Sequence, residues 1–470
     1  MLFNSLGFVV FLTIVLLLYY SRLSWMHKKI MLLFASYVFY AMWNPPLVIL
    51  LWISTAVDWI AGNKLSKEEN PGKRKMWLML SLVTNLGFLA FFKYGGFLLE
   101  NFTQLMQVFG VDFQAAKPDI ILPMGISFYT FQTMSYTLDM YFRRGERART
   151  LLDFSLYVTF FPQLVAGPIV RSGDLVSQFY EPKKATQRQF FWGMFLLTLG
   201  LFEKVVLADA LLSETSDAVF SATALLHPLD AWAGTLAFSG QIFFDFAGYS
   251  TCAIGIALMM GFWITDNFKY PYGAIGFSDF WRRWHITLST WLRDYLYIPL
   301  GGNRKGVART YVNLMLTMLL GGLWHGASWT FVIWGALHGF YLMAERFFRE
   351  RVSIRITPLK GIVLAFLTYF CVNVTWVFFR AADFTSAMKM LASMFFIQSG
   401  GEKVLQYVNL GIVYVLIPIL FLVHYFMRNT SVKEVAAKMP AWVLGVVWAL
   451  MFILIAVAQG TGEQFIYFQF

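Results

Sequence analysis

The stretch Leu319-Leu-Gly-Gly-Leu-Trp-His-Gly-Ala-Ser-Trp-Thr330 decides the class of fold, because it sets a histidine deep inside an apolar region. The nearest charged residues are Arg309 upstream and Glu345 downstream. A helix that crosses a bilayer needs about 20 mostly apolar residues. The region therefore predicts two membrane-spanning helices, over 310–325 and 327–347. An ionisable side chain in such a position is costly and is by default a candidate for function.

The composition of the whole chain agrees with a membrane protein. Of its 470 residues, 58% are hydrophobic and 13% are charged, whereas a soluble domain carries about 25% charged residues. The net charge is +11, but the basic residues lie in short runs between apolar segments. That pattern is typical of cytoplasmic loops and not of a groove for nucleic acid. We therefore expect an all-α polytopic membrane protein, with lipid and not nucleic acid around it.

Apolar segments recur along the chain and predict about 11–12 transmembrane helices in a single domain that covers 1–470. Asn44-Pro45-Pro46 predicts a tight hairpin between the second and third. Lys and Arg gather in alternate loops, such as 64–75 and 143–149, which places these loops in the cytoplasm and both ends of the chain outside. The predicted segments are 5–20, 30–43, 47–62, 76–94, 120–142, 188–210, 231–261, 310–325, 327–347, 359–379, 406–427 and 441–458.

Two further segments do not fit a simple crossing. The segment 151–170 lies between two basic loops and carries Phe161-Pro162 and Ala166-Gly167-Pro168 in its middle. Broken backbone is tolerated at membrane depth only where protein or water surrounds it, so we expect a re-entrant segment on the cytoplasmic side. The segment 262–309 is too polar to span. Its portion 279–296 has the pattern of one amphipathic interfacial helix at the cytoplasmic surface.

Two histidines are candidates for chemistry. A histidine titrates near neutral pH and can act as a general base, so His325 is a candidate catalytic base, with a hydrogen bond between packed helices as the alternative. His285 lies in the interfacial segment, where a structural role is the simpler alternative. His338 follows His325 by thirteen residues, about 220° around a helix, and we interpret it as structural. The others, which we interpret as surface residues, are His27, His227 and His424.

Other chemistry has weaker support in the sequence. The chain has no H-E-x-x-H or C-x-x-C motif, and no carboxylate lies one turn from His325, so we expect no metal site. Asp245 lies in an apolar segment and needs a partner or stays protonated. Arg304 and Lys305 are able to attract an anionic ligand, although the charge of a cytoplasmic loop is the simpler explanation. The aromatic tail 459–470 is either an interfacial anchor, which composition alone favours, or a segment that docks.

At this point the motifs resemble a known family. The block 279–328 contains Trp281-Arg-Arg-Trp-His-Ile-Thr-Leu-Ser-Thr-Trp-Leu-Arg-Asp-Tyr-Leu-Tyr-Ile-Pro-Leu-Gly-Gly-Asn-Arg304 and then Leu319-Leu-Gly-Gly-Leu-Trp-His-Gly-Ala327. It resembles the membrane-bound O-acyltransferase (MBOAT) family, and within it the bacterial alginate O-acetyltransferase branch of the AlgI type. Further matching motifs are Leu122-Pro-Met-Gly-Ile-Ser-Phe-Tyr129, Phe161-Pro-Gln-Leu-Val-Ala-Gly-Pro-Ile169 and Phe244-Asp-Phe-Ala-Gly-Tyr-Ser250.

The resemblance implies a role for each matched residue. His325 falls on the family's catalytic histidine, and His285 falls on its second polar position. The implied fold is a ring of tilted helices around a central cavity, where funnels from both faces meet near the histidine. The implied donor is acetyl-CoA, or another cytoplasmic acyl thioester, with no bound cofactor. Tyr467 lies in a terminal motif whose tyrosine is implied to carry the acyl group transiently. The residues implied in donor entry are Arg282, Arg283, Arg304 and Lys305.

The function implied is O-acetylation outside the cell by an enzyme of the bacterial inner membrane. Acetyl groups would pass across the membrane to an extracytoplasmic SGNH-type acetylase, which modifies alginate or a similar exopolysaccharide. Peptidoglycan or teichoic-acid acylation stays open within the enzyme class. A proton-coupled transporter of an envelope polymer precursor is the rival class, although no inverted repeat is evident. A non-catalytic scaffold is a third reading, and it predicts that His325 tolerates substitution.

Overall fold

The structure is a computed structural model that describes residues 1–113, 120–352, 356–395, 400–458 and 465. Within these ranges the regular structure is helical, apart from one isolated bridge between Leu226 and Glu402. Each predicted apolar segment corresponds to a helix, which confirms the all-α membrane fold. The described helices that are long and apolar enough to cross a membrane are Pro45–Leu65, Pro71–Val108, Pro228–Met259, Pro358–Arg380, Tyr407–Met427 and Ala441–Ala458.

The contacts divide the chain into two compact units. The first unit comprises residues 1–197 and 252–265, and the second comprises 198–251 and 266–470. The single domain and the ring with a central cavity, both expected from the sequence, stay predictions. The helices of the first unit are α1 (Leu6–Tyr20), α2 (Trp25–Ala41), α3 (Val48–Leu65), α4 (Pro71–Val108), α5 (Ile126–Tyr141), α6 (Leu151–Thr159) and α7 (Ser172–Leu175).

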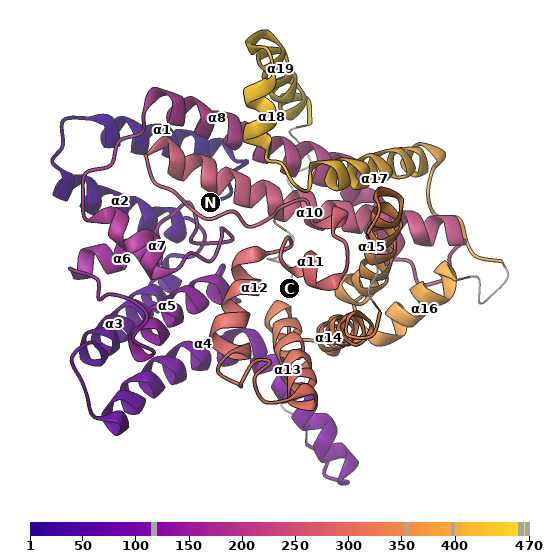
Figure 1. Cartoon of the computed structure of the whole chain (residues 1–470), viewed down its shortest axis with the longest axis horizontal. Coiled ribbons are helices and arrows are strands. Elements are labelled where there is room, and N and C mark those ends of the chain that lie inside the picture. The colour runs from indigo at the N-terminus through magenta and orange to yellow at the C-terminus, as the bar shows by residue number, and fades with distance from the viewer. Residues whose placement is uncertain (114–119, 353–355, 396–399, 459–464, 466–470) are drawn as a thin grey trace. The chain divides into compact units, whose positions relative to one another are not determined.

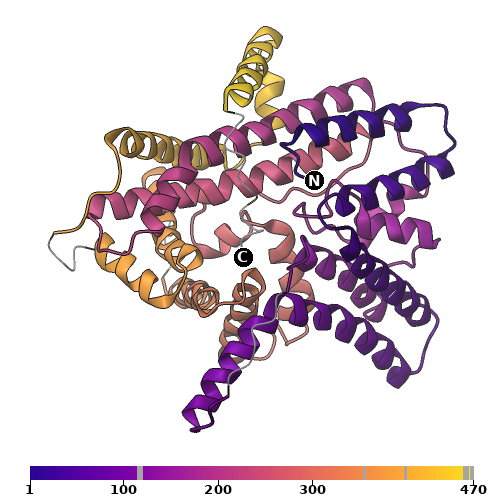
Figure 2. The same cartoon turned by 180° about the vertical axis from the view of Figure 1, so that it is seen from behind.

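A buried carboxylate joins three helices of the first unit. Asp58 of α3 is fully buried and accepts hydrogen bonds from Ser81 and Asn85 of α4 and from Thr137 of α5. The Asn85 and Thr137 bonds measure 2.7 and 2.6 Å. Because a buried charge is tolerated only where it is hydrogen-bonded or paired, these donors fix how the three helices pack. Helix α4, which carries Ser81 and Asn85, is the long helix that is also visible when the molecule is seen from behind (Figure 2).

The segment 151–170 is helical only in its first half. Helix α6 ends at Thr159, and the backbone from 160 to 171 forms turns and irregular structure. Every residue from 153 to 170 is nevertheless buried. This agrees with the expectation that broken backbone here is surrounded by protein. Its entry and exit on the cytoplasmic side stay a prediction.

The second unit holds every described candidate residue. Helices α8 (Gln187–Leu201) and α10 (Pro228–Met259) contribute residues to both units. A π-helix over Phe202–Ser213 continues α8. The other helices of this unit are α9 (Glu214–Phe220), α11 (Phe277–Trp281), α12 (Ile286–Leu292), α13 (Val307–His325), α14 (Trp329–Arg349), α15 (Pro358–Arg380), α16 (Phe384–Met394), α17 (Tyr407–Met427), α18 (Val432–Lys438) and α19 (Ala441–Ala458).

Helices α13 and α14 pack against each other as a hairpin (Figure 1), and α13 ends at the candidate histidine, His325, just before the turn. Gly326 has extended backbone and ends α13, and the Ser328 hydroxyl caps α14 by accepting from the Thr330 N–H at 3.3 Å. Glycines then let the two helices approach closely. A Cβ added at Gly335 would lie 2.3 Å from the carbonyl oxygen of Met318.

This close approach gives a stability prediction. Gly335→Ala is expected to destabilise the protein by about 1–3 kcal/mol, because the hairpin must open to admit the methyl group. Gly411→Ala in α17 is the matched control, since a Cβ there meets nothing within 4 Å and alanine favours a helix over glycine. The measurement is the apparent melting temperature of each purified variant in detergent. Equal melting temperatures for the two variants would contradict the prediction.

Candidate active site

His325 is the last residue of α13 and lies in a box of aromatic rings. Its side chain is buried, with an exposed fraction of 2%. The ring centroid lies 5.0 Å from that of Trp324, 5.0 Å from that of Trp334 and 5.3 Å from that of Phe379. These rings come from α13, α14 and α15, so three helices hold the imidazole in one orientation. The sequence had placed His325 inside an apolar region, and the burial agrees.

His285 interrupts the segment that was expected to form one interfacial helix. Helix α11 ends at Trp281, and α12 begins at Ile286. His285 lies between them with φ +42°, in the left-handed region that side chains rarely adopt. It is fully buried, as is Trp284. The single amphipathic helix over 279–296 was therefore wrong at this point, because the chain turns inward to bury both rings.

The two candidate histidines meet although forty residues separate them. Their ring centroids are 6.5 Å apart. The His285 ring also contacts Phe246 of α10 at 4.7 Å and Trp324 at 5.9 Å. Two imidazoles at this separation, in a largely apolar setting, are able to act on one small group between them, one as a base and one as a hydrogen-bonding partner.

Asn267 contacts His285 and was missed by the sequence analysis. Its side-chain oxygen Oδ1 lies 3.1 Å from the His285 Nδ1. Asn267 follows α10 in a polar stretch without a motif, so neither apolar spacing nor charge marked it. The only signal in the sequence was that the residue lies within the segment 262–309, which is too polar to span.

A second layer of aromatic residues lies behind His325. Trp334 of α14 is fully buried, and its ring lies 4.6 Å from His338 and 5.9 Å from Trp376. His338 Nε2 lies 3.0 Å from the Thr375 hydroxyl of α15, a hydrogen bond that ties α14 to α15. These contacts favour the structural role that the sequence analysis gave to His338.

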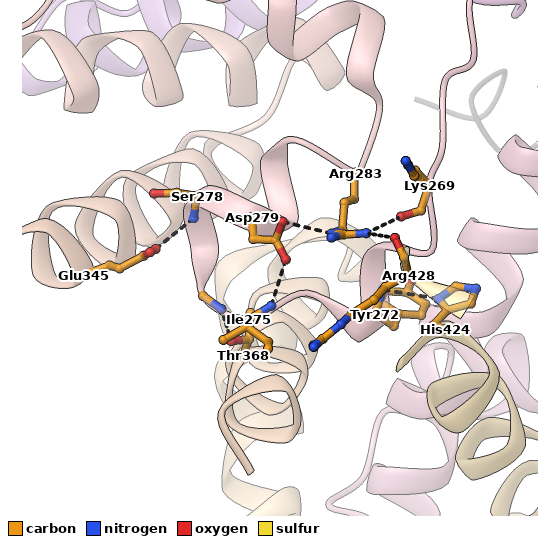
Figure 3. Close-up of polar contacts among 11 residues, drawn as sticks. Lys269, Tyr272, Ile275, Ser278, Asp279, Arg283, Glu345, Thr368, His424 and Arg428 are labelled. Carbon is orange, nitrogen blue, oxygen red and sulfur yellow. Dashed lines mark hydrogen bonds and ion pairs between the residues drawn. The ribbon is translucent and has the colours of Figure 1, made fainter. Parts of the chain in front are cut away.

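The basic residues expected at the donor entrance fall into two groups. Arg282, Arg304 and Lys305 are exposed, so they are accessible to an anionic ligand. Arg283 instead connects separate parts of the chain: it pairs with Asp279 at 2.9 Å and donates to the backbone carbonyl of Arg428 at 2.7 Å (Figure 3). The contacts of Arg283 favour a structural role, and its part in donor binding stays a prediction.

His424 is not a surface residue, contrary to the expectation from its position near a span end. It is 2% exposed, and its Nδ1 accepts from the Tyr272 backbone N–H at 3.2 Å (Figure 3). Its ring packs 4.6 Å from Phe243 of α10. The loop around Tyr272 lies about 150 residues earlier in the chain and covers this part of α17. Local sequence therefore gave no sign of the burial.

Asp245 has the partner that its position in an apolar segment required. Lys204 of the π-helix lies 2.7 Å from Asp245 of α10 and 2.8 Å from Asp209. All three side chains are at most 10% exposed. In the part of the chain that the structure describes, no three His, Cys, Asp or Glu side chains gather as a metal site would require. The expectation of no metal stays a prediction.

Comparison with known proteins identifies the family of the chain. The family model described as "MBOAT, membrane-bound O-acyltransferase family" matches residues 146–368, a range that contains both His285 and His325. The chain is 44% identical, over 84% of its length, to the "Probable alginate O-acetylase AlgI" of Pseudomonas putida, and covers 80% of that protein. It is 38% identical to the "Peptidoglycan O-acetyltransferase" of Helicobacter pylori, over 78% of this chain and 73% of that protein.

A more distant relative has a different acyl group in its name. The "Teichoic acid D-alanyltransferase" of Bacillus subtilis is 27% identical over 53% of this chain and 67% of its own length. The named activities thus share acyl transfer and differ in the acyl group and the acceptor. Because the similarity extends over most of both proteins at 44% identity, the chain belongs to the membrane-bound O-acyltransferase family and is an acyltransferase.

Proposed function

We propose that this protein transfers acetyl groups from acetyl-CoA, a cytoplasmic acyl thioester, for the O-acetylation of an extracytoplasmic polysaccharide such as alginate. The observation that carries the proposal is the buried pair of His285 and His325, 6.5 Å apart, in a chain 44% identical to a probable alginate O-acetylase. We place the protein in the bacterial inner membrane, with an SGNH-type acetylase outside the membrane as its partner.

The proposed chemistry needs one base and one leaving group. His325 accepts the proton of the attacking hydroxyl, whose oxygen bonds to the acyl carbon of the thioester. The carbon–sulfur bond then breaks, and the thiolate leaves and takes up the proton from the imidazolium, so the base is restored. Removal of a proton by a positioned base contributes about 10²–10⁴-fold to the rate. The exposed Arg282, Arg304 and Lys305 are proposed to attract the phosphates of the donor at the cytoplasmic entrance.

Peptidoglycan is the second candidate acceptor. The observation in its favour is 38% identity to a peptidoglycan O-acetyltransferase across 78% of this chain. Both acceptors present sugar hydroxyls, so the same base serves either reaction. The choice between them then depends on the partner that receives the acyl group outside the membrane and not on the histidine pair.

The test compares acetyl transfer to the candidate acceptors. Inverted membrane vesicles that contain the protein and its partner acetylase are supplied with labelled acetyl-CoA, and label is measured in alginate and in peptidoglycan fragments. We expect label in alginate and loss of O-acetyl groups from the exopolysaccharide of cells that lack the protein. Label in peptidoglycan alone would favour the second acceptor. Export of polymer without any acyl transfer would overturn the enzyme proposal in favour of a transporter.

Tyr467 is proposed to take the acyl group transiently on its way to the partner. Tyr467 lies outside the described residues, but Phe465, two residues earlier, is described and is 1% exposed. The Phe465 ring lies 5.1 Å from that of Tyr249 and 5.8 Å from that of Phe246, the residue that also contacts His285. At Phe465 the tail therefore docks on the protein, which favours the docking alternative over an interfacial anchor.

This relay predicts a split between two reactions. Tyr467→Phe is expected to abolish acetylation of the polysaccharide, because the phenyl ring offers no oxygen to acylate. Consumption of acetyl-CoA by water in the purified protein would persist, since the histidines are intact. Mass spectrometry of the C-terminal peptide after a pulse of acetyl-CoA provides the check. Normal polysaccharide acetylation by the variant would remove the relay and leave the enzyme proposal standing.

A further inference from the structure

The orientation of the His285 imidazole depends on Asn267, a residue outside the proposed acyl-transfer chemistry. Asn267 is 1% exposed and lies between α10 and α11. Its side chain joins three elements. Oδ1 faces the His285 Nδ1 at 3.1 Å and the Thr287 hydroxyl at 2.9 Å, and Nδ2 donates to the Ser250 hydroxyl of α10 at 3.2 Å.

The backbone of Thr287 fixes which atom of the amide faces the histidine. The Thr287 backbone N–H donates to Oδ1 at 3.3 Å. A backbone N–H is always a donor, so the atom it faces must be the amide oxygen and not the NH₂ group. The amide of Asn267 is therefore oriented without reference to the histidine, which removes the usual ambiguity of asparagine side chains.

An amide oxygen only accepts hydrogen bonds, and this determines the tautomer of His285. The neutral imidazole has one N–H and one nitrogen lone pair. Because Oδ1 accepts, the proton of the neutral ring lies on Nδ1, and Nε2 keeps the lone pair. A hydrogen bond at one ring nitrogen determines whether the other nitrogen carries a proton or a lone pair, as it does for histidines that bind metals or act as bases.

Asn267 also holds the strained backbone of His285. The left-handed conformation at φ +42° is unfavourable for a residue with a side chain, because the Cβ approaches the following carbonyl oxygen. The next two residues secure it: the Ile286 N–H donates to the Asn267 backbone carbonyl at 2.9 Å, and the Thr287 N–H donates to Oδ1. One residue thus fixes both the position of the ring and the site of its proton.

We propose that Asn267 is a positioning residue that holds His285 as the Nδ1–H tautomer and so presents Nε2 as a hydrogen-bond acceptor in the candidate active site. In the neutral state, His285 then accepts from the attacking hydroxyl or from His325, and it does not donate from Nε2 to the acyl oxygen. The catalytic consequence rests on the proposed acyl transfer, whereas the tautomer does not depend on it.

The first experiment measures the tautomer directly. The protein is labelled with ¹⁵N-histidine, and ¹H–¹⁵N spectra that connect ring nitrogens to ring protons report which nitrogen carries the proton. The His285→Gln variant assigns the signals of His285 by their loss. We expect the Nδ1–H pattern in the wild type and a mixture or reversal in Asn267→Leu. An Nε2–H pattern in the wild type would overturn the proposal whatever the protein's activity.

The second experiment uses the pH profile of acyl transfer. Asn267→Asp keeps the acceptor but adds a negative charge beside Nδ1, which favours the protonated ring. As the pH falls, the neutral form of the His285 ring is then lost at a higher pH than in the wild type. The acidic limb of the pH profile of acyl transfer therefore moves to higher pH. Among the described residues, the rings around His285 are Phe246, Phe268, Trp324 and His325. Of these only His325 carries an ionisable ring, and it is present in every variant.

Matched asparagine variants distinguish a loss of His285 positioning from a general loss of packing. Asn267→Leu is expected to lower kcat by about 10–100-fold with little change in KM for acetyl-CoA, by analogy with the loss seen when the partners that orient metal-bound histidines are removed. Asn373→Leu removes another buried asparagine, one that bonds to the Tyr369 carbonyl, and should keep the wild-type pH limb. If Asn267→Leu does not fold, Asn267→Asp decides alone. An unmoved acidic limb in Asn267→Asp, in a wild type that transfers acetyl groups, would overturn the inference and leave the enzyme proposal intact.

Discussion

The His325→Ala protein is expected to transfer acetyl groups about 10²–10⁴-fold more slowly than the wild type, because the base that accepts the hydroxyl proton is lost. The effect should appear in kcat, since His325 is buried among Trp324, Trp334 and Phe379, whereas the basic residues expected to attract the donor are exposed. The measurement is the rate of label transfer from acetyl-CoA per folded molecule in vesicles. His325→Gln, which is closer in volume but not basic, should be as slow.

His338 offers a matched control for this prediction. It is also fully buried, and its ring contacts the same Trp334, at 4.6 Å against 5.0 Å for His325. Both substitutions to alanine therefore open space against one tryptophan. We expect His338→Ala to reduce the amount of folded protein, because the bond to Thr375 is lost, while each folded molecule stays active. Equal loss of turnover in both variants would mean that the aromatic packing, and not a base, carries the effect.

The helices were predictable because their signals are local. The segment predicted at 359–379 is α15, Pro358–Arg380, and the one predicted at 441–458 is α19 with the same bounds. At α15 the Thr357 hydroxyl caps the first turn and Pro358 occupies a position that suits proline. Apolar length and capping residues suffice for such a helix, and neither depends on a distant part of the chain.

The arrangement of the site depends on contacts between distant residues, and the sequence could not predict it. The motif around His285 led to the wrong local structure, since a continuous amphipathic pattern does not reveal the turn that Asn267 stabilises. His424 was misplaced for the same reason. Its burial depends on the loop at Tyr272, which pairs with it across 152 residues.

The second large effect is expected on stability, when the buried Lys204 is replaced. Lys204→Met is expected to destabilise the protein by about 3–5 kcal/mol, because it leaves the carboxylates of Asp209 and Asp245 buried without the cation that both contact. The π-helix is what brings the first pair together. In an α-helix, residues five apart lie about 140° from each other around the axis, whereas i to i+5 bonding aligns Lys204 with Asp209.

The matched variant removes all three charges at once. In Lys204→Met/Asp209→Asn/Asp245→Asn no ion is left unpaired, and replacing a whole buried ionic cluster is far less costly than removing one member. The yield of folded protein in detergent and its melting temperature should therefore fall sharply in the single variant and recover in the triple variant. If the triple variant is as unstable as Lys204→Met, the loss comes from packing at this position and not from charge. Recovery would instead show that the single variant is unstable because the carboxylates of Asp209 and Asp245 are left buried without a cation, and not because the lysine side chain no longer packs there.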